Sequence, residues 1–174
     1  MSMKSTFTKA AVVAAAVPAL ALATTGSAYA ASGISWVQRA TDHCLMWHHN
    51  TDGSYWVSGD NICWNDGNQQ GVKWDDSQSG LENQTGEYWT EKVNGTGVCL
   101  TAYWAPSGSN TGPAYLEPCS GPANYYEQWK EVWVGNGFQL QNRETGWCLD
   151  GNGSGDMYTT PCDPNHNNKY QIWY

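Results

Sequence analysis

The chain has 174 residues, of which 16 are acidic and 8 are basic, so its formal net charge is −8. A surface with this excess of carboxylates repels nucleic acid and anionic membranes, and we expect neither as a partner. The length fits one domain of ordinary size, and the eleven tryptophans supply large apolar rings for a core or a binding surface.

Residues 1–30 have the pattern of a secretory signal peptide. Two lysines precede the apolar run AAVVAAAVPALALA, and the segment ends in the small-x-small pattern Ala28-Tyr29-Ala30. We expect cleavage before Ala31, which leaves a mature domain of residues 31–174. The apolar run is too short to span a bilayer, and no later stretch is longer. The sequence therefore predicts a secreted, extracellular protein without membrane insertion.

The mature chain repeats one sequence unit three times. The units open with SWVQRATDHCL at residues 35–45, YWTEKVNGTGVCL at 88–100 and FQLQNRETGWCL at 138–149. Each opening is followed by a glycine-rich polar loop, a second cysteine, another polar loop and a closing tryptophan, in GVKWD, YEQWK or YQIWY. Repetition of this length indicates three copies of one supersecondary unit.

The residue pattern within each unit is that of β-strands. Short runs of alternating, β-branched and aromatic residues are separated by Asn, Asp, Gly and Pro. No segment has the periodicity of an amphipathic helix. We therefore predict an all-β fold in which each unit contributes four short strands.

Six cysteines in an exported chain predict three disulfides, which sequence alone allows to form in fifteen ways. Repetition favours pairing within each unit, where the two cysteines are 19, 20 and 14 residues apart. The predicted pairs are Cys44–Cys63, Cys99–Cys119 and Cys148–Cys162. Oxidised cysteines leave no thiolate for metal binding or nucleophilic catalysis. We predict no metal site, no cofactor and no enzymatic activity.

Three copies of a Cys-Leu start, a second cysteine and a closing Gln-x-Trp resemble the ricin-B-type lectins and related carbohydrate-binding modules. The resemblance covers residues 31–174 and implies the β-trefoil fold. The third unit has the full closing motif, Gln171-Ile172-Trp173, whereas the earlier units end in Glu127-Gln128-Trp129 and Val72-Lys73-Trp74. The residues expected in the core are Trp74, Trp129, Gln171 and Trp173.

The resemblance also implies the position of a sugar site. In this family an aspartate after the Cys-Leu pair, an aromatic ring before the second cysteine and amide or imidazole groups after it hold the sugar. The carboxylate accepts hydrogen bonds from hydroxyls, and the ring covers the apolar face of the sugar. The third unit matches best, with Asp150, Tyr158, Asn165, His166, Asn167 and Asn168. Thr160 lies nearer to the place of the family's ring.

The other two units lack the aspartate. Thr101 follows the middle Cys-Leu pair, and Met46 follows the first. Neither side chain can hold a pair of hydroxyls as a carboxylate does. The resemblance therefore implies one retained sugar site, in the third unit.

Two other roles remain open for Asp150. An aspartate before glycine often hydrogen-bonds its own backbone in a turn. The segment DGNGSGD also resembles the start of a calcium-binding loop, with Asp150, Asn152 and Ser154 at alternate positions. Pro161 stands where such a loop requires a bidentate glutamate. We therefore expect no tight calcium site.

The sequence favours two functional interpretations over a trefoil protease inhibitor, which comes third, and a hydrolase, which comes last. The first is a secreted, non-enzymatic, lectin-like protein whose partner is a glycan or polysaccharide. The second is a degenerate trefoil that docks another secreted protein, as a subunit of a toxin or an enzyme. The absence of the aspartate from two of the three units favours the second interpretation.

Overall fold

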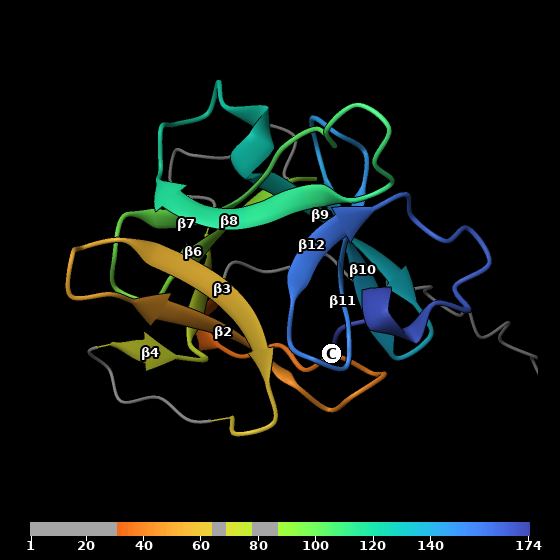
Figure 1. The fold of residues 1–174 in the computed structure, drawn as a ribbon, viewed down its shortest axis with the longest axis horizontal. Coiled ribbons are helices and arrows are strands. Elements are labelled where there is room, and N and C mark those ends of the chain that lie inside the picture. Colours follow the sequence, from red (N-terminus) through yellow and green to blue (C-terminus); the bar gives the residue numbers. More distant parts are fainter. Residues whose placement is uncertain (1–30, 64–68, 78–86) are drawn as a thin grey trace, which may run out of the picture.

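The computed structural model describes residues 31–63, 69–77 and 87–174, and this part of the chain consists of β-strands, turns and two short 3₁₀ helices (Figure 1). The strands are β1 (Ala31–Ile34), β2 (Cys44–His49), β3 (Tyr55–Asp60), β4 (Gln70–Gly71), β5 (Trp74–Ser77), β6 (Trp89–Val93), β7 (Val98–Ala102), β8 (Gly112–Pro118), β9 (Gln128–Val134), β10 (Gly137–Asn142), β11 (Cys148–Gly151) and β12 (Met157–Thr160). The 3₁₀ helices are η1 (Tyr125–Glu127) and η2 (Lys169–Gln171). The fold is all-β, as the alternating sequence runs predict.

Each sequence unit contains an antiparallel hairpin that begins at or next to its first cysteine. β2 pairs with β3, β7 with β8, and β11 with β12. The first cysteine of each unit lies opposite a residue shortly before the second cysteine, in the pairs Cys44 and Asp60, Cys99 and Glu117, and Cys148 and Thr160. This shared register brings the two cysteines of each unit close together.

The hairpins of the middle and third units belong to one continuous sheet. Its order is β1-β5-β6-β7-β8-β12-β11-β10-β9. β6 also pairs with β9, so the strands β6, β7, β8, β12, β11, β10 and β9 form a closed ring. The hairpin of the first unit lies in a separate sheet of order β3-β2-β4. The units are therefore not equal four-stranded blocks, since β4 has only two residues and pairs within its own unit.

The segment after η2 joins the third unit to the first. Trp173 forms backbone bridges with both Phe138 and Gln38. The N–H of Val37 donates to the carbonyl of Tyr174 at 2.9 Å, and the N–H of Tyr174 donates to the carbonyl of Val37 at 3.1 Å. The three units are thus linked around a common core.

The closing tryptophans form part of this core. Trp74, Trp129 and Trp173 are completely buried, and so are the leucines of the three Cys-Leu pairs. Each indole N–H donates to the leucine carbonyl of its own unit, at 2.9 Å for Trp74, 2.8 Å for Trp129 and 3.4 Å for Trp173. Burial of large apolar rings drives folding, and the bonded N–H avoids the cost of an unpaired donor.

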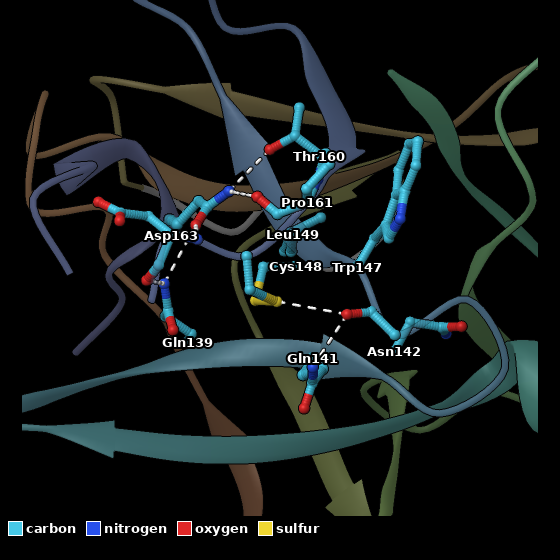
Figure 2. Close-up of a disulfide and its surroundings, with 12 residues drawn as sticks. Gln139, Gln141, Asn142, Trp147, Cys148, Leu149, Thr160, Pro161 and Asp163 are labelled. Atoms are coloured by element: carbon cyan, nitrogen blue, oxygen red, sulfur yellow. Dashed lines mark hydrogen bonds between the residues drawn. A yellow bond between two sulfur atoms is a disulfide. The ribbon is translucent and has the colours of Figure 1, made fainter. Parts of the chain in front are cut away.

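Three disulfides join Cys44 to Cys63, Cys99 to Cys119 and Cys148 to Cys162, which are the pairs that repetition predicts. The six cysteines of the chain are all oxidised. Figure 2 shows the third disulfide beside Thr160, Pro161 and Asp163. Each disulfide crosslinks the two ends of a hairpin whose loops are rich in glycine and polar residues.

The two 3₁₀ helices lie just before the closing tryptophans of the middle and third units. Asn124 caps η1 by accepting from the N–H of Tyr126 at 3.2 Å, and Asn168 caps η2 by accepting from the N–H of Tyr170 at 3.1 Å. A single turn is too short to show a hydrophobic period, so the sequence predicts neither. Across the described ranges, no helix has the length and apolar character needed to cross a membrane.

Candidate functional site

Asp150 lies on β11, directly after the third Cys-Leu pair. β11 and β12 pair so that Asp150 lies opposite Tyr158, and paired residues project from the same face of a sheet. The preceding Leu149 projects from the other face and is completely buried in the core. Only 4% of Asp150 is exposed. Asp150 is therefore a buried residue of strand β11 and does not lie in an exposed turn.

The carboxylate of Asp150 accepts four hydrogen bonds. Its Oδ2 accepts from Thr160 Oγ1 at 2.6 Å, from Asn168 Nδ2 at 3.0 Å and from Gln171 Nε2 at 3.2 Å. Its Oδ1 accepts from the N–H of Gly151 at 2.8 Å. Because each carboxylate oxygen has about two lone-pair sites, Oδ2 is fully occupied by the protein. Oδ1 has one protein donor and retains capacity to accept from a hydroxyl.

Gln171 connects this carboxylate to the segment around the third disulfide. Its Nε2 also donates to Thr160 Oγ1 at 2.7 Å and to the carbonyl of Pro161 at 3.0 Å, while its Oε1 accepts from the N–H of Asp163 at 2.8 Å. Of these residues, Figure 2 labels Thr160, Pro161 and Asp163 beside the disulfide. The sequence predicts Gln171 as a core residue. The structure places it both in the core and in direct contact with Asp150.

Asp163 holds the loop that carries the predicted amide and imidazole groups. Its carboxylate accepts from the N–H of Asn165 at 2.9 Å, of Asn167 at 2.6 Å and of Asn168 at 2.8 Å. These backbone donors, first those of Asn165 and Asn168, lower the pKa of Asp163 below its ordinary value. Asn168 is thereby fixed with its amide on Asp150.

Asn165 and His166 lie elsewhere on the same loop. Both are exposed, and their backbone N–H groups bond Asp163, through its carboxylate and its carbonyl respectively. His166 adopts a left-handed backbone conformation with φ of 57°. Of the amide and imidazole residues predicted for the site, the structure places Asn168 on Asp150 and leaves Asn165, His166 and Asn167 around Asp163.

Tyr158 lies beside Asp150 with its hydroxyl already bonded. The hydroxyl donates to the carbonyl of Gly151 at 2.8 Å, and the side chain is half-buried. Burial, followed by the negative charges of Asp150 and Asp156, raises the pKa of Tyr158. Tyr158 is therefore a neutral residue at physiological pH, with a ring rather than a free hydroxyl to present to a ligand.

The positions equivalent to Asp150 in the other units face the interior. Thr101 is completely buried, and its hydroxyl donates to the carbonyl of Cys99 at 3.4 Å. Met46 is completely buried and packs against Cys44 and Val72. Both side chains fill space in the domain and present no polar group to a ligand.

Glu127 supplies a buried carboxylate in the middle unit, but this carboxylate accepts hydrogen bonds from the loop between Cys119 and η1. It accepts from the N–H and hydroxyl of Ser120, at 2.9 and 2.7 Å, and from Asn124 Nδ2 at 2.8 Å. In the third unit Gln171 makes the corresponding bond to the residue after the second cysteine. Glu127 therefore corresponds in position and role to Gln171, and the middle unit has no counterpart of Asp150.

The DGNGSGD segment forms a turn held by its own side chains. Asn152 Oδ1 accepts from the N–H of Ser154 at 2.9 Å and of Asp156 at 3.1 Å, and Asn152 Nδ2 donates to Asp156 Oδ2 at 2.9 Å. Within the described ranges, no group of three or more His, Cys, Asp or Glu side chains is arranged to hold a metal ion. The side-chain oxygens of Asn152 and Asp156 that make these bonds are thus engaged within the turn itself.

Comparison with known proteins gives matches in structure alone. No protein-family model matches the chain, and no curated protein matches it by sequence. The designed threefold-symmetric protein ThreeFoil aligns with a TM-score of 0.55 and 18% identity, over 80% of this chain and 94% of its own. SeviL, solved bound to the asialo-GM1 saccharide, aligns with a TM-score of 0.54 and 14% identity, over 82% of this chain and 95% of its own.

These neighbours are β-trefoil proteins. The comparisons support a β-trefoil fold. A GlcNAcα1-4Gal-releasing endo-β-galactosidase from Clostridium perfringens also aligns, with a TM-score of 0.56 and 20% identity, over 82% of this chain but only 31% of the enzyme. Identity at this level establishes similarity of fold and nothing more specific.

Proposed function

We propose that the chain is a secreted, non-enzymatic carbohydrate-binding protein of the ricin-B type, a β-trefoil of three units with one sugar site in the third. Asp150 is the carboxylate of this site and Tyr158 supplies its aromatic face. Asn168 positions the carboxylate and lies at the edge of the site. The partner is a glycan or polysaccharide outside the cell.

The observation that carries the proposal is the asymmetric bonding of Asp150. Thr160, Asn168 and Gln171 saturate Oδ2 and fix the carboxylate before any ligand arrives. Oδ1 keeps acceptor capacity beside the Tyr158 ring. A sugar presents hydroxyl donors along one edge and C–H groups on its face, so it matches an acceptor placed beside a ring.

A fixed carboxylate favours binding because little side-chain entropy remains to be lost. A hydroxyl that donates to Oδ1 makes a charge-assisted hydrogen bond, which contributes about 1.5–3 kcal/mol. One such site with a shallow contact gives weak binding to a single sugar. Useful avidity then requires a ligand that carries many copies of the sugar.

The test is a glycan array followed by titration of the best ligand into wild type and Asp150→Asn. The variant can keep an oxygen at the Oδ2 position for the three protein donors, but it puts an amide N–H₂ where Oδ1 accepts. We expect a loss of affinity of about tenfold to a hundredfold, the equivalent of about 1.5–3 kcal/mol.

The matched control is Asp156→Asn in the same hairpin, because Asp156 is exposed and bonds Asn152 instead of Asp150. It removes the same charge and should leave affinity within about twofold of wild type, as expected of a surface charge outside the site. A wild type that binds no glycan, or an Asp150→Asn protein that binds as tightly as wild type, contradicts the proposal and favours docking to another secreted protein.

A further inference from the structure

Two tyrosine rings and two cations form a cluster that shares no residue with the Asp150 site. Its members are Tyr88, Tyr125, Lys130 and Arg143, and we call this group the cation–ring cluster. The pairing of β6 with β9, continued by one residue, places Tyr88 opposite Lys130. Tyr125 comes from η1, and Arg143 comes from the turn between β10 and β11. Four segments that are distant in the sequence thus contribute one side chain each.

Both cations of the cluster lie over aromatic rings. Arg143 Cζ is 3.8 Å from the centre of the Tyr125 ring and 5.1 Å from that of the Tyr88 ring. Lys130 Nζ is 5.9 Å from the centre of the Tyr88 ring. A cation within about 6 Å of a ring centre is attracted to the ring face. The rings therefore hold the two positive charges beside each other.

Arg143 is also fixed by Gln128, which is fully buried. Its Nη1 donates to Gln128 Oε1 at 2.6 Å, and its backbone N–H donates to the carbonyl of Gln128 at 2.7 Å. Within the described ranges, Nε and Nη2 donate to no protein acceptor. A guanidinium presents its N–H groups as a fork that matches the two oxygens of a carboxylate. Arg143 therefore keeps one edge for a carboxylate that the protein does not supply.

The two cations lack carboxylate partners although the chain is acidic. Residues 31–174 contain six lysines and arginines against 16 acidic residues, and two of the six lie in this cluster. Among the residues that the structure describes, neither Lys130 nor Arg143 forms an ion pair, and even the adjacent Glu144 does not pair with Arg143. Charges more than about 8 Å away are largely screened at physiological ionic strength. The cluster is thus a local positive region on an acidic domain.

The rings determine what kind of anion fits the cluster. Tyr125 is 41% exposed although Arg143 lies over its ring, so apolar ring surface remains for a ligand. An aromatic ring matches the C–H face of a sugar. The net charge of −8 disfavours a polyanion such as nucleic acid, whereas an acidic sugar brings a single negative charge. A ring surface beside an open guanidinium edge therefore fits a sugar that carries a carboxylate.

We propose that the cation–ring cluster is a second binding site, for a saccharide residue that carries a carboxylate, such as a uronic acid. Arg143 binds the carboxylate through Nε and Nη2, Lys130 adds a second positive charge, and Tyr125 contacts the apolar face of the sugar ring. This site goes beyond the proposed function, because it requires neither Asp150 nor the ligand of Asp150.

The test is an NMR titration of the oxidised chain with methyl galacturonoside, with its uncharged methyl ester and with acetate. The ester keeps the sugar ring without the charge, and acetate keeps the charge without the ring. We expect the galacturonoside to bind about tenfold more tightly than either, because it alone engages both the fork and the ring. Its largest shifts should fall on the Arg143 side chain and the Tyr125 ring. Equal affinity for the galacturonoside and either control ligand overturns the proposal.

Variants identify the residue that binds the carboxylate. Arg143→Gln removes the fork and should weaken galacturonoside binding about tenfold. Arg39→Gln is the matched control, because Arg39 also donates to an amide oxygen, that of Asn136, but contacts no aromatic ring in the described part of the chain. The control removes the same charge and should bind within about twofold of wild type. An Arg143→Gln protein that binds the galacturonoside as tightly as wild type overturns the assignment.

Asp150→Asn separates this site from the one proposed above. The variant should lose its neutral glycan and keep the galacturonoside. Loss of galacturonoside binding in Asp150→Asn, with normal binding in Arg143→Gln, would place the acidic sugar at Asp150 and overturn the second site. Urea unfolding of Arg143→Gln tests a purely structural role. A less stable variant, together with a wild type that does not distinguish the galacturonoside from its ester, would show that the cluster only joins η1 to the turn between β10 and β11.

Discussion

Asp163 is a single carboxylate on which the order of a whole loop depends. Three backbone N–H groups converge on it, and they lower its pKa. A group with a lowered folded-state pKa stabilises the fold above its unfolded pKa, near 3.9, and this stabilisation is lost as the pH falls through the folded pKa. The loop should therefore open in acid, and with it the amide of Asn168 should leave Asp150.

Asp163→Asn tests this dependence, because an amide cannot accept at both former oxygen positions. We expect the variant to be less stable than wild type at pH 7, with stability that changes less between pH 5 and pH 2. Its sugar affinity should fall although Asp150 is intact. Urea unfolding at a series of pH values measures the first effect and glycan titration the second. An unchanged acid dependence would show that the loop does not rely on this carboxylate.

At the scale of single residues the sequence predicts the carboxylate of the proposed sugar site but not the residues that hold it in place. Asp150 and Asn168 follow from their positions relative to the cysteines. Thr160 and Gln171 donate to Asp150 across 10 and 21 residues, and only the tertiary fold brings such residues together. The Gln-x-Trp motif marks Gln171 without showing that its amide bonds a carboxylate. Asn165 and His166 share the loop with Asn168, but the convergence of their N–H groups on Asp163 has no sequence pattern of its own.

At the scale of elements, the turn between β11 and β12 is fixed by a contact with the first unit. Gly155 has a positive φ of 89°, and its carbonyl accepts from the N–H of Gly59 at 2.8 Å. A Cβ at Gly155 would collide with the carbonyl oxygen of Gly59. The closeness of two backbones therefore requires glycine here for both conformation and space.

Gly155→Ala should destabilise the domain by about 1–3 kcal/mol, from the left-handed conformation and the collision together. Gly153→Ala is the matched control in the same turn, since a Cβ there meets no atom within 4 Å. We expect the control to stay within about 0.5 kcal/mol of wild type. Urea unfolding of both variants provides the comparison, and equal stabilities would show that the turn can move away from the first unit.

The elements themselves are the part of the structure that the sequence predicts best. Alternation and turn residues locate the hairpins because each is short and bounded by glycine, asparagine or aspartate. The separation of β3, β2 and β4 from the main sheet is not predictable in this way, because the sequence of β2 resembles those of β7 and β11. What differs is the partner strand, and the partner is chosen by packing between units.

In the molecule as a whole each of the three units has its own disulfide, so we expect each disulfide to form independently of the other two. Replacement of Cys148 and Cys162 by alanine should cost about 3 kcal/mol in the chain-entropy model, for a loop of about 15 residues. The other two pairs should still form, because each depends on its own hairpin. Urea unfolding measures the loss, and peptide mapping without reduction identifies the remaining bonds. A bond between Cys44 and Cys99 in this variant would show that the units do not fold separately.

Trp173 forms backbone bridges with both Phe138 and Gln38. If the chain is exported as we propose, these bridges can form only after all three units have left the export channel. A polypeptide threaded through an export channel from its amino end can oxidise each hairpin as it emerges. The backbone hydrogen bonds between the first and third units cannot form until Trp173 and Tyr174 have also left the channel. Until then the core position of Trp173 is unfilled, so we expect the exported chain to be more sensitive to proteases before this segment emerges than after it.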